Sequence, residues 1–213
     1  MFYNEILEIT GRTLLVSGAA TILASLWSIP LALLLISSQS RISKAIQDLL
    51  NSLVAIPTVV LGLILYSIFS RSGPLGFLEL LYTPTCISIG QSLLITPLIT
   101  SVATTSLMKV KEKIWELLIA LGASNIQSMT ALLREGLPQI IRSTLIGFNR
   151  AVGELGVALM VGGNIKGFTR VMTTAIALEV SKGSYELALS LGIILLALSI
   201  TVTLIVRVIG GRE

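Results

Sequence analysis

Residues 186–209 read ELALSLGIILLALSITVTLIVRVI, and no residue between Glu186 and Arg207 is charged. A helix of about 20 apolar residues is long enough to cross the roughly 30 Å of hydrocarbon in a bilayer. The stretch shows neither the polar face of a surface helix nor the alternation of a half-buried strand. It therefore predicts a transmembrane helix.

Similar stretches recur along the chain. They cover residues 13–36 (TLLVSGAATILASLWSIPLALLLI), 48–69 (DLLNSLVAIPTVVLGLILYSIF), 86–107 (CISIGQSLLITPLITSVATTSL) and 143–163 (STLIGFNRAVGELGVALMVGG). Hydrophobic residues make up 54% of the 213 residues and charged residues 12%, against about a quarter in soluble domains. Aromatic residues, at 5%, are too few for the girdles of an outer-membrane barrel. We expect an all-α membrane protein with about five spans and one domain, 1–213.

Several function classes are disfavoured by composition. The net charge is +4, but the basic residues lie mostly at span ends, so we expect no nucleic-acid partner. One cysteine, Cys86, and no histidine leave no combination suited to a metal site or a catalytic relay, and we expect no cofactor. No Gly-x-x-x-x-Gly-Lys phosphate loop occurs, so the chain is not expected to hydrolyse ATP.

Basic residues also predict the orientation. With the N-terminus outside, the inner segments hold Arg41, Lys44, Lys109, Lys111, Lys113, Arg134, Arg142, Arg207 and Arg212, and the outer ones Arg12, Arg71, Lys166, Arg170 and Lys182. Inner loops are usually the more basic, so we expect the N-terminus outside and the C-terminus in the cytoplasm. Residues 2–10 (FYNEILEIT) are either a short interfacial helix or a disordered end.

The longest inner loop, residues 108–142, is too long for a simple connection. Apolar residues recur at helical spacing up to Leu121, Gly122 stops that helix, and Ser124 can cap a second helix that runs to about Arg134. We expect two short helices joined at an elbow that docks a soluble partner. The alternative is an amphipathic pair lying on the membrane.

The elbow carries a family resemblance. Its residues Glu116, Leu117, Leu118, Gly122, Ala123 and Ser124 resemble the "EAA…G" loop of ABC importer membrane subunits, in which a short coupling helix docks into the ATPase. Leu117 and Leu118 replace the usual two alanines. Leu137-Pro138 follows three residues later than the family pattern.

Other segments resemble the molybdate/tungstate branch of this family. They are PTVVLGL from Pro57, RAVGELG from Arg150 and VGGN from Val161. The stretches FSRSGPLG from Phe69 and LYTP from Leu81, and residues 163–176, most resemble tungstate-specific permeases. The resemblance implies a type I ABC importer permease in the cell membrane, with tungstate as the expected substrate and molybdate or sulfate as alternatives. A secondary transporter would favour an inverted repeat and several buried acids, and a membrane enzyme a clustered polar site; neither pattern occurs.

The resemblance also implies partners. They are a second copy of the chain, two ABC ATPase subunits, an extracytoplasmic oxyanion-binding protein and membrane lipid. We expect that binding protein near the outer segment 164–183, where residues 171–180 are too few for a span. Lys166 and Arg170 of this segment are expected to attract an anion.

Two sets of polar residues fall inside the spans. Thr96, Thr100 and Thr104 form one helical row that either faces the translocation pathway or permits close helix packing. Arg150 and Glu154 lie one turn apart and are expected to form an intramembrane ion pair, acting as a structural clamp or in the pathway. Pro57 is expected to bend the second span.

Overall fold

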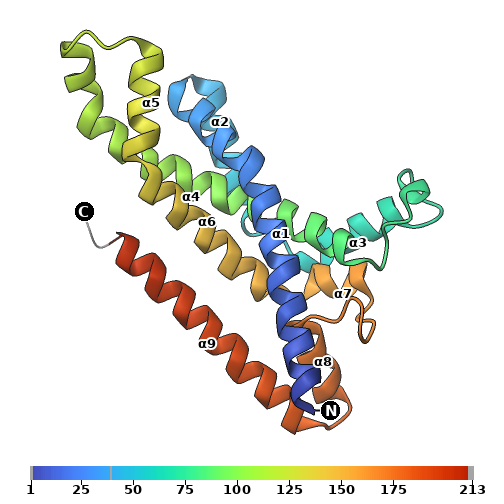
Figure 1. Cartoon of the computed structure of the whole chain (residues 1–213). Coiled ribbons are helices and arrows are strands. Elements are labelled where there is room, and N and C mark those ends of the chain that lie inside the picture. The colour runs from blue at the N-terminus through green and yellow to red at the C-terminus, as the bar shows by residue number, and fades with distance from the viewer. Residues whose placement is uncertain (1, 39, 211–213) are drawn as a thin grey trace.

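The structure is a computed structural model that describes residues 2–38 and 40–210. Within them every regular element is helical (Figure 1). The elements are α1 (Phe2–Ser37), α2 (Arg41–Leu53), α3 (Thr58–Phe69), the 3-10 helix η1 (Gly76–Leu78), α4 (Pro84–Ala120), α5 (Asn125–Glu135), α6 (Leu137–Val152), α7 (Gly156–Gly162), α8 (Met172–Ser181) and α9 (Tyr185–Gly210). The predicted all-helical fold is confirmed.

Helices α1, α4 and α9 are long and apolar enough to cross a membrane unbroken. The predicted spans 48–69 and 143–163 are not single straight helices: α2 and α3 meet at a bend of 100°, and α6 and α7 at one of 61°. The described chain thus offers three spans, or up to five if each bent pair counts as one. The expected five spans correspond to the upper value.

The break between α2 and α3 has a local cause. Proline disfavours helical backbone in the residue before it and carries no N–H for the helix ladder. Pro57 therefore stands at the start of α3, where its carbonyl accepts from the Val60 and Leu61 N–H groups. The expectation that Pro57 bends one continuous span underestimated its effect, because the helix stops and restarts.

The N-terminal residues do not form a separate element. Residues 2–10 are the first turns of α1, and Ile6 and Ile9 are buried beside Met172 of α8 and Leu187 of α9. Both alternatives considered for this segment, an interfacial helix and a disordered end, are therefore wrong. The apolar face of these turns is covered by protein.

The predicted loop 108–142 is almost entirely helical. Helix α4 continues thirteen residues beyond the predicted end of its span and stops at Ala120, so the first short helix of the loop is the end of α4. Gly122 follows with φ +76°, a backbone conformation that glycine adopts without a Cβ clash. Helix α5 then ends near the predicted position, and α6 begins at Leu137 with Pro138 in its first turn.

Helix packing centres on α1 and α4, which run along each other. Ala20, Ala24 and Ser28 are fully buried on α1, as expected for small residues at a close helix contact. Helix α7 packs on α3, and α9 lies along α6 and α8. Figure 1 shows the elbow between α4 and α5 at the opposite end of the molecule from α8 and the N-terminus.

Replacing Gly156 by Ala tests the contact between α7 and α3. A Cβ at Gly156 would clash with the Thr58 hydroxyl and lie 2.9 Å from the Val59 nitrogen. We expect a loss of about 1–3 kcal/mol in unfolding free energy, measured as a lower thermal midpoint in detergent. Gly192→Ala on α9, where a Cβ meets nothing within 4 Å, is the control and should not lower the midpoint. Equal midpoints for the two variants would contradict the close contact.

Candidate functional site

The elbow places the predicted coupling residues together at one end of the molecule. Leu121 closes α4, Gly122 turns the chain, and Ser124 caps α5. The Ser124 hydroxyl accepts from the Gln127 N–H at 3.3 Å, and the Gln127 side chain accepts from the Ser124 N–H at 2.8 Å. This reciprocal capping box fixes the start of α5 without tertiary contacts.

The elbow exposes large apolar side chains. Leu121 is 74% exposed and Ile126 80%, and Leu117 and Ile119 are also exposed. On α5, by contrast, Met129 and Leu133 pack against a buried cluster around Leu107 and Leu132. Contiguous exposed apolar side chains beside a fixed turn are typical of a docking surface. The sequence pattern placed Leu121 at the end of a helix but did not predict that Leu121 and Ile126 would be this exposed.

The second site is polar and lies between the end of α6 and the start of α7. Arg150 Nη1 is 2.6 Å from Glu154 Oε2, so the two residues form an ion pair. Glu154 does not continue the helix of Arg150 but lies in the break, where its other carboxylate oxygen accepts from the Val157 N–H at 3.2 Å. The Glu154 side chain is 2% exposed and that of Arg150 39%. The pair therefore ties the end of α6 to the start of α7.

Neighbouring helices supply the remaining partners of the break. Gln91 Nε2 on α4 donates to the Ala151 carbonyl at 3.1 Å, and Ser17 of α1 donates to Gln91 Oε1 at 3.2 Å. Thr173 on α8 donates to the Glu154 carbonyl at 2.7 Å. Gln91 and Thr173 were not singled out from the sequence, because nothing local distinguishes them from other small or polar residues in apolar helices.

A cavity of about 380 Å³ opens beside this ion pair. Arg150 and Glu154 form part of its wall, together with Thr58 and Val59 of the first turn of α3 and Gly156 of α7. The two helix breaks thus meet at one place. Apart from Arg150 and Glu154, the described residues that line the cavity are uncharged.

The threonine row of α4 lies largely inside the protomer. Thr100 is 0% exposed, and its hydroxyl donates to the Thr96 carbonyl at 2.9 Å. Thr96 is half-buried and accepts from Trp27 Nε1 at 2.6 Å. Thr104 is buried, and its hydroxyl has no hydrogen-bond partner among the described residues. The row faces α1 and α2 here, and its role in the pathway stays a prediction.

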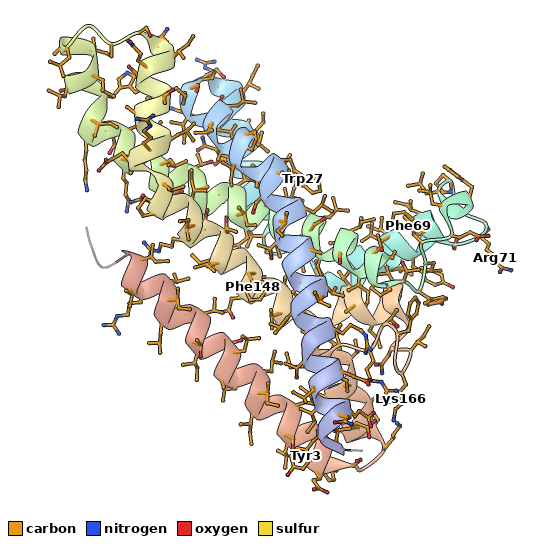
Figure 2. All side chains as sticks on the ribbon, viewed as in Figure 1. Tyr3, Trp27, Phe69, Arg71, Phe148 and Lys166 are labelled. Atoms are coloured by element: carbon orange, nitrogen blue, oxygen red, sulfur yellow. The ribbon has the colours of Figure 1, made fainter. Side chains whose placement is uncertain are left out.

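Ion pairs hold the segment 164–183 in place. Lys166 and Arg170 approach Glu5 of α1 at 2.8 and 3.7 Å. Arg170 and Lys182 approach Glu179 of α8 at 3.8 and 3.0 Å. Figure 2 shows Lys166 at the same end of the molecule as Tyr3. The expectation that Arg170 attracts an anion is wrong, because its side chain is buried between two carboxylates.

Among residues 2–38 and 40–210, no group of three or more His, Cys, Asp or Glu side chains could hold a metal ion. The candidate sites are the exposed apolar elbow and the ion-paired helix break.

Comparison with known proteins identifies the family. The family described as "Binding-protein-dependent transport system inner membrane component" matches residues 20–212. The chain belongs to this family. It is therefore a multi-pass membrane component of a transport system that works with a binding protein.

Two relatives are similar over nearly their whole length. The "Tungstate uptake system permease protein TupB" of Peptoclostridium acidaminophilum is 38% identical over 206 residues, covering 96% of this chain and 90% of that protein. A "Probable anion ABC transporter permease protein" of Haloferax volcanii is 34% identical, covering 97% and 90%. Among solved structures, inward-facing MetNI methionine ABC transporter matches with a TM-score of 0.72 at 15% identity, covering 96% of this chain and 95% of that one. The family fold is thus that of an ABC importer permease.

Replacing Arg150 by Gln tests the clamp at the break. Glu154 would remain buried with one partner fewer, so we expect a loss of about 1–3 kcal/mol, reduced by the partial exposure of Arg150. Two quantities are measured: the yield of monodisperse protein in size-exclusion chromatography and the thermal midpoint of that protein. Arg150→Gln/Glu154→Gln removes both charges and should recover most of the yield. Normal assembly of the single variant with altered anion flux would instead favour a role in the pathway.

Acidification should weaken the ion pairs of segment 164–183 through Glu179. The hydrogen bond from Lys182 holds the pKa of Glu179 below its ordinary value, and the charge of Arg170 adds to this effect. A lowered pKa in the folded state means stabilisation that is complete above the ordinary carboxyl pKa and lost as the pH falls through the folded value, below about 4.3. As the pH falls below about 4.3, we expect the thermal midpoint of Glu179→Gln to decrease less than the thermal midpoint of wild type. Parallel pH profiles would contradict the assignment.

Proposed function

We propose that this chain is the permease subunit of an ATP-driven oxyanion importer, with tungstate as its substrate. The similarity to a tungstate uptake permease over 96% of the chain carries this proposal. The second relative, named for anion transport, supports the oxyanion class. Molybdate and sulfate remain the alternative substrates.

Energy for transport comes from two separate ATPase subunits that dock at the elbow. The exposed Leu121 and Ile126 would be buried by an ATPase, and the capping box at Ser124 presents them on a rigid turn. Because ATP is cytoplasmic, the elbow lies inside. The N-terminus and α8, at the opposite end of the molecule in Figure 1, then lie outside, where an oxyanion-binding protein docks.

A second copy of the chain completes the pathway. Val54, Ala55 and Pro57, at the break between α2 and α3, are exposed on the single protomer, as is the apolar face of α3 with Val59, Val60, Leu63 and Ile64. Irregular backbone at membrane depth is tolerated only where protein or a water-filled cavity covers it. Symmetric pairing of two copies along α3 supplies that cover.

The pathway residues follow from this assembly. The cavity at Arg150 and Glu154 lies next to the first turn of α3 and would therefore be near the interface between copies. We assign the ion pair a structural clamp role at that place. The row of Thr96, Thr100 and Thr104 supplies neutral hydroxyl donors if α1 and α2 move away from α4 during transport.

Replacing Gly122 by Glu tests docking and coupling together. A charged side chain would enter the ATPase contact, and the φ of +76° adds backbone strain. Gly122→Ala is the matched control, because it meets the same φ of +76° and has open space around a Cβ, but adds no charged side chain to the elbow. The measurement is ATPase activity of the permease–ATPase complex in liposomes, with binding protein loaded with tungstate, molybdate or sulfate.

We expect loaded binding protein to stimulate wild type and Gly122→Ala, but not Gly122→Glu. The rank order of the three anions identifies the substrate. If wild type neither binds an ATPase nor responds to any oxyanion, the importer proposal is wrong and a secondary transporter becomes the leading alternative.

A further inference from the structure

A groove of about 610 Å³ lies at the elbow end of the molecule, away from the helix breaks. Its walls come from the second half of α4, the end of α5, the start of α6 and the last turns of α9. The apolar wall residues are Val110, Ile114, Leu137, Ile141, Val208 and Ile209. Figure 1 shows the C-terminal end of α9 diverging from α4 and α5, and the groove lies between these helices.

Three charged side chains also line this groove: Lys113, Arg134 and Glu135. All three are exposed, and none forms an ion pair with a described residue. The neighbouring Lys111 differs, because it donates to the Ile36 carbonyl at 2.9 Å and lies over the Trp115 ring. The groove therefore has an excess of one positive charge, and its two cations are free to bind an anion.

The groove also lies at the level where lipid headgroups are expected. Its wall residues on α4 and α6 lie just outside the apolar stretches 86–107 and 143–163, and Val208 and Ile209 end the stretch 186–209. Cations at such a boundary face phosphate groups, while apolar walls below them face acyl chains. The groove thus presents cations to a headgroup phosphate and apolar walls to acyl chains, as binding of an anionic phospholipid requires.

We propose that this groove binds an anionic phospholipid, with the phosphate between Lys113 and Arg134 and an acyl chain against Ile141 and Val208. A zwitterionic lipid would bring its own cation toward Lys113 and Arg134 and gain less. A soluble protein partner fits less well, because Val208 and Ile209 belong to a stretch that is otherwise surrounded by lipid. The proposal depends on the membrane location of the chain and not on which anion it transports.

Lipid titration of the full chain by native mass spectrometry tests this site. The probes are dioleoyl phosphatidylglycerol, dioleoyl phosphatidylcholine and inorganic phosphate alone. Lys113→Gln/Arg134→Gln removes the two cations, and Arg41→Gln/Lys44→Gln is the charge-matched control on exposed positions of α2. Val208→Trp leaves the charges intact and fills the groove from a position that is exposed on the protomer.

We expect wild type to prefer phosphatidylglycerol over phosphatidylcholine. Lys113→Gln/Arg134→Gln should weaken phosphatidylglycerol binding about tenfold, and Val208→Trp should weaken it as well. The control should keep the wild-type preference. Unchanged binding by either groove variant, or an equal loss in the control, would overturn the proposal. So would inorganic phosphate that binds wild type as tightly as the lipid does, because the site would then be one for a soluble anion.

Discussion

Backbone groups that leave a helix inside a membrane must find partners within the protein, because hydrocarbon offers none. At the break between α6 and α7 the protein meets this constraint with side chains from other helices. Gln91 of α4 binds the Ala151 carbonyl, Thr173 of α8 binds the Glu154 carbonyl, and the Glu154 carboxylate binds the Val157 N–H. The break therefore fixes α4, α7 and α8 relative to one another. Arg150 pairs with the buried carboxylate of Glu154 and neutralises its charge.

The same constraint is met differently at the break between α2 and α3. There Val54, Ala55 and Ile56 donate only to carbonyls of the preceding turn, and much of the segment is exposed on the protomer. In a single copy, side chains of other helices thus satisfy the α6–α7 break but not the α2–α3 break. Since Gly156 brings the start of α7 directly onto the first turn of α3, the α6–α7 break positions the α2–α3 break. This arrangement places the proposed interface between copies next to the ion pair.

Charge is distributed unequally between the two ends of the molecule. At the N-terminal end, Lys166, Arg170 and Lys182 are all paired with Glu5 or Glu179, and Arg12 donates to the carbonyls of Gly167 and Arg170. These contacts tie segment 164–183 and α8 to the start of α1. At the elbow end, Lys113 and Arg134 form no ion pair within residues 2–38 and 40–210, and they adjoin exposed apolar side chains. The charged side chains of the N-terminal end therefore bind one another, while those of the elbow end are available to bind other molecules.

The sequence by itself determined the helical membrane class, the location of the first, third and fifth apolar stretches in α1, α4 and α9, the turn at Gly122 with its cap at Ser124, and the reach of Arg150 to Glu154. Each follows from interactions within about one helical turn, which residue type and spacing specify. Only the tertiary structure decided that α4 runs on to Ala120, that the span 143–163 is broken between α6 and α7, and that Thr100 and Arg170 are buried. These features depend on partners far away along the chain, such as Gln91 for Ala151 and Glu5 for Arg170, which no local pattern specifies.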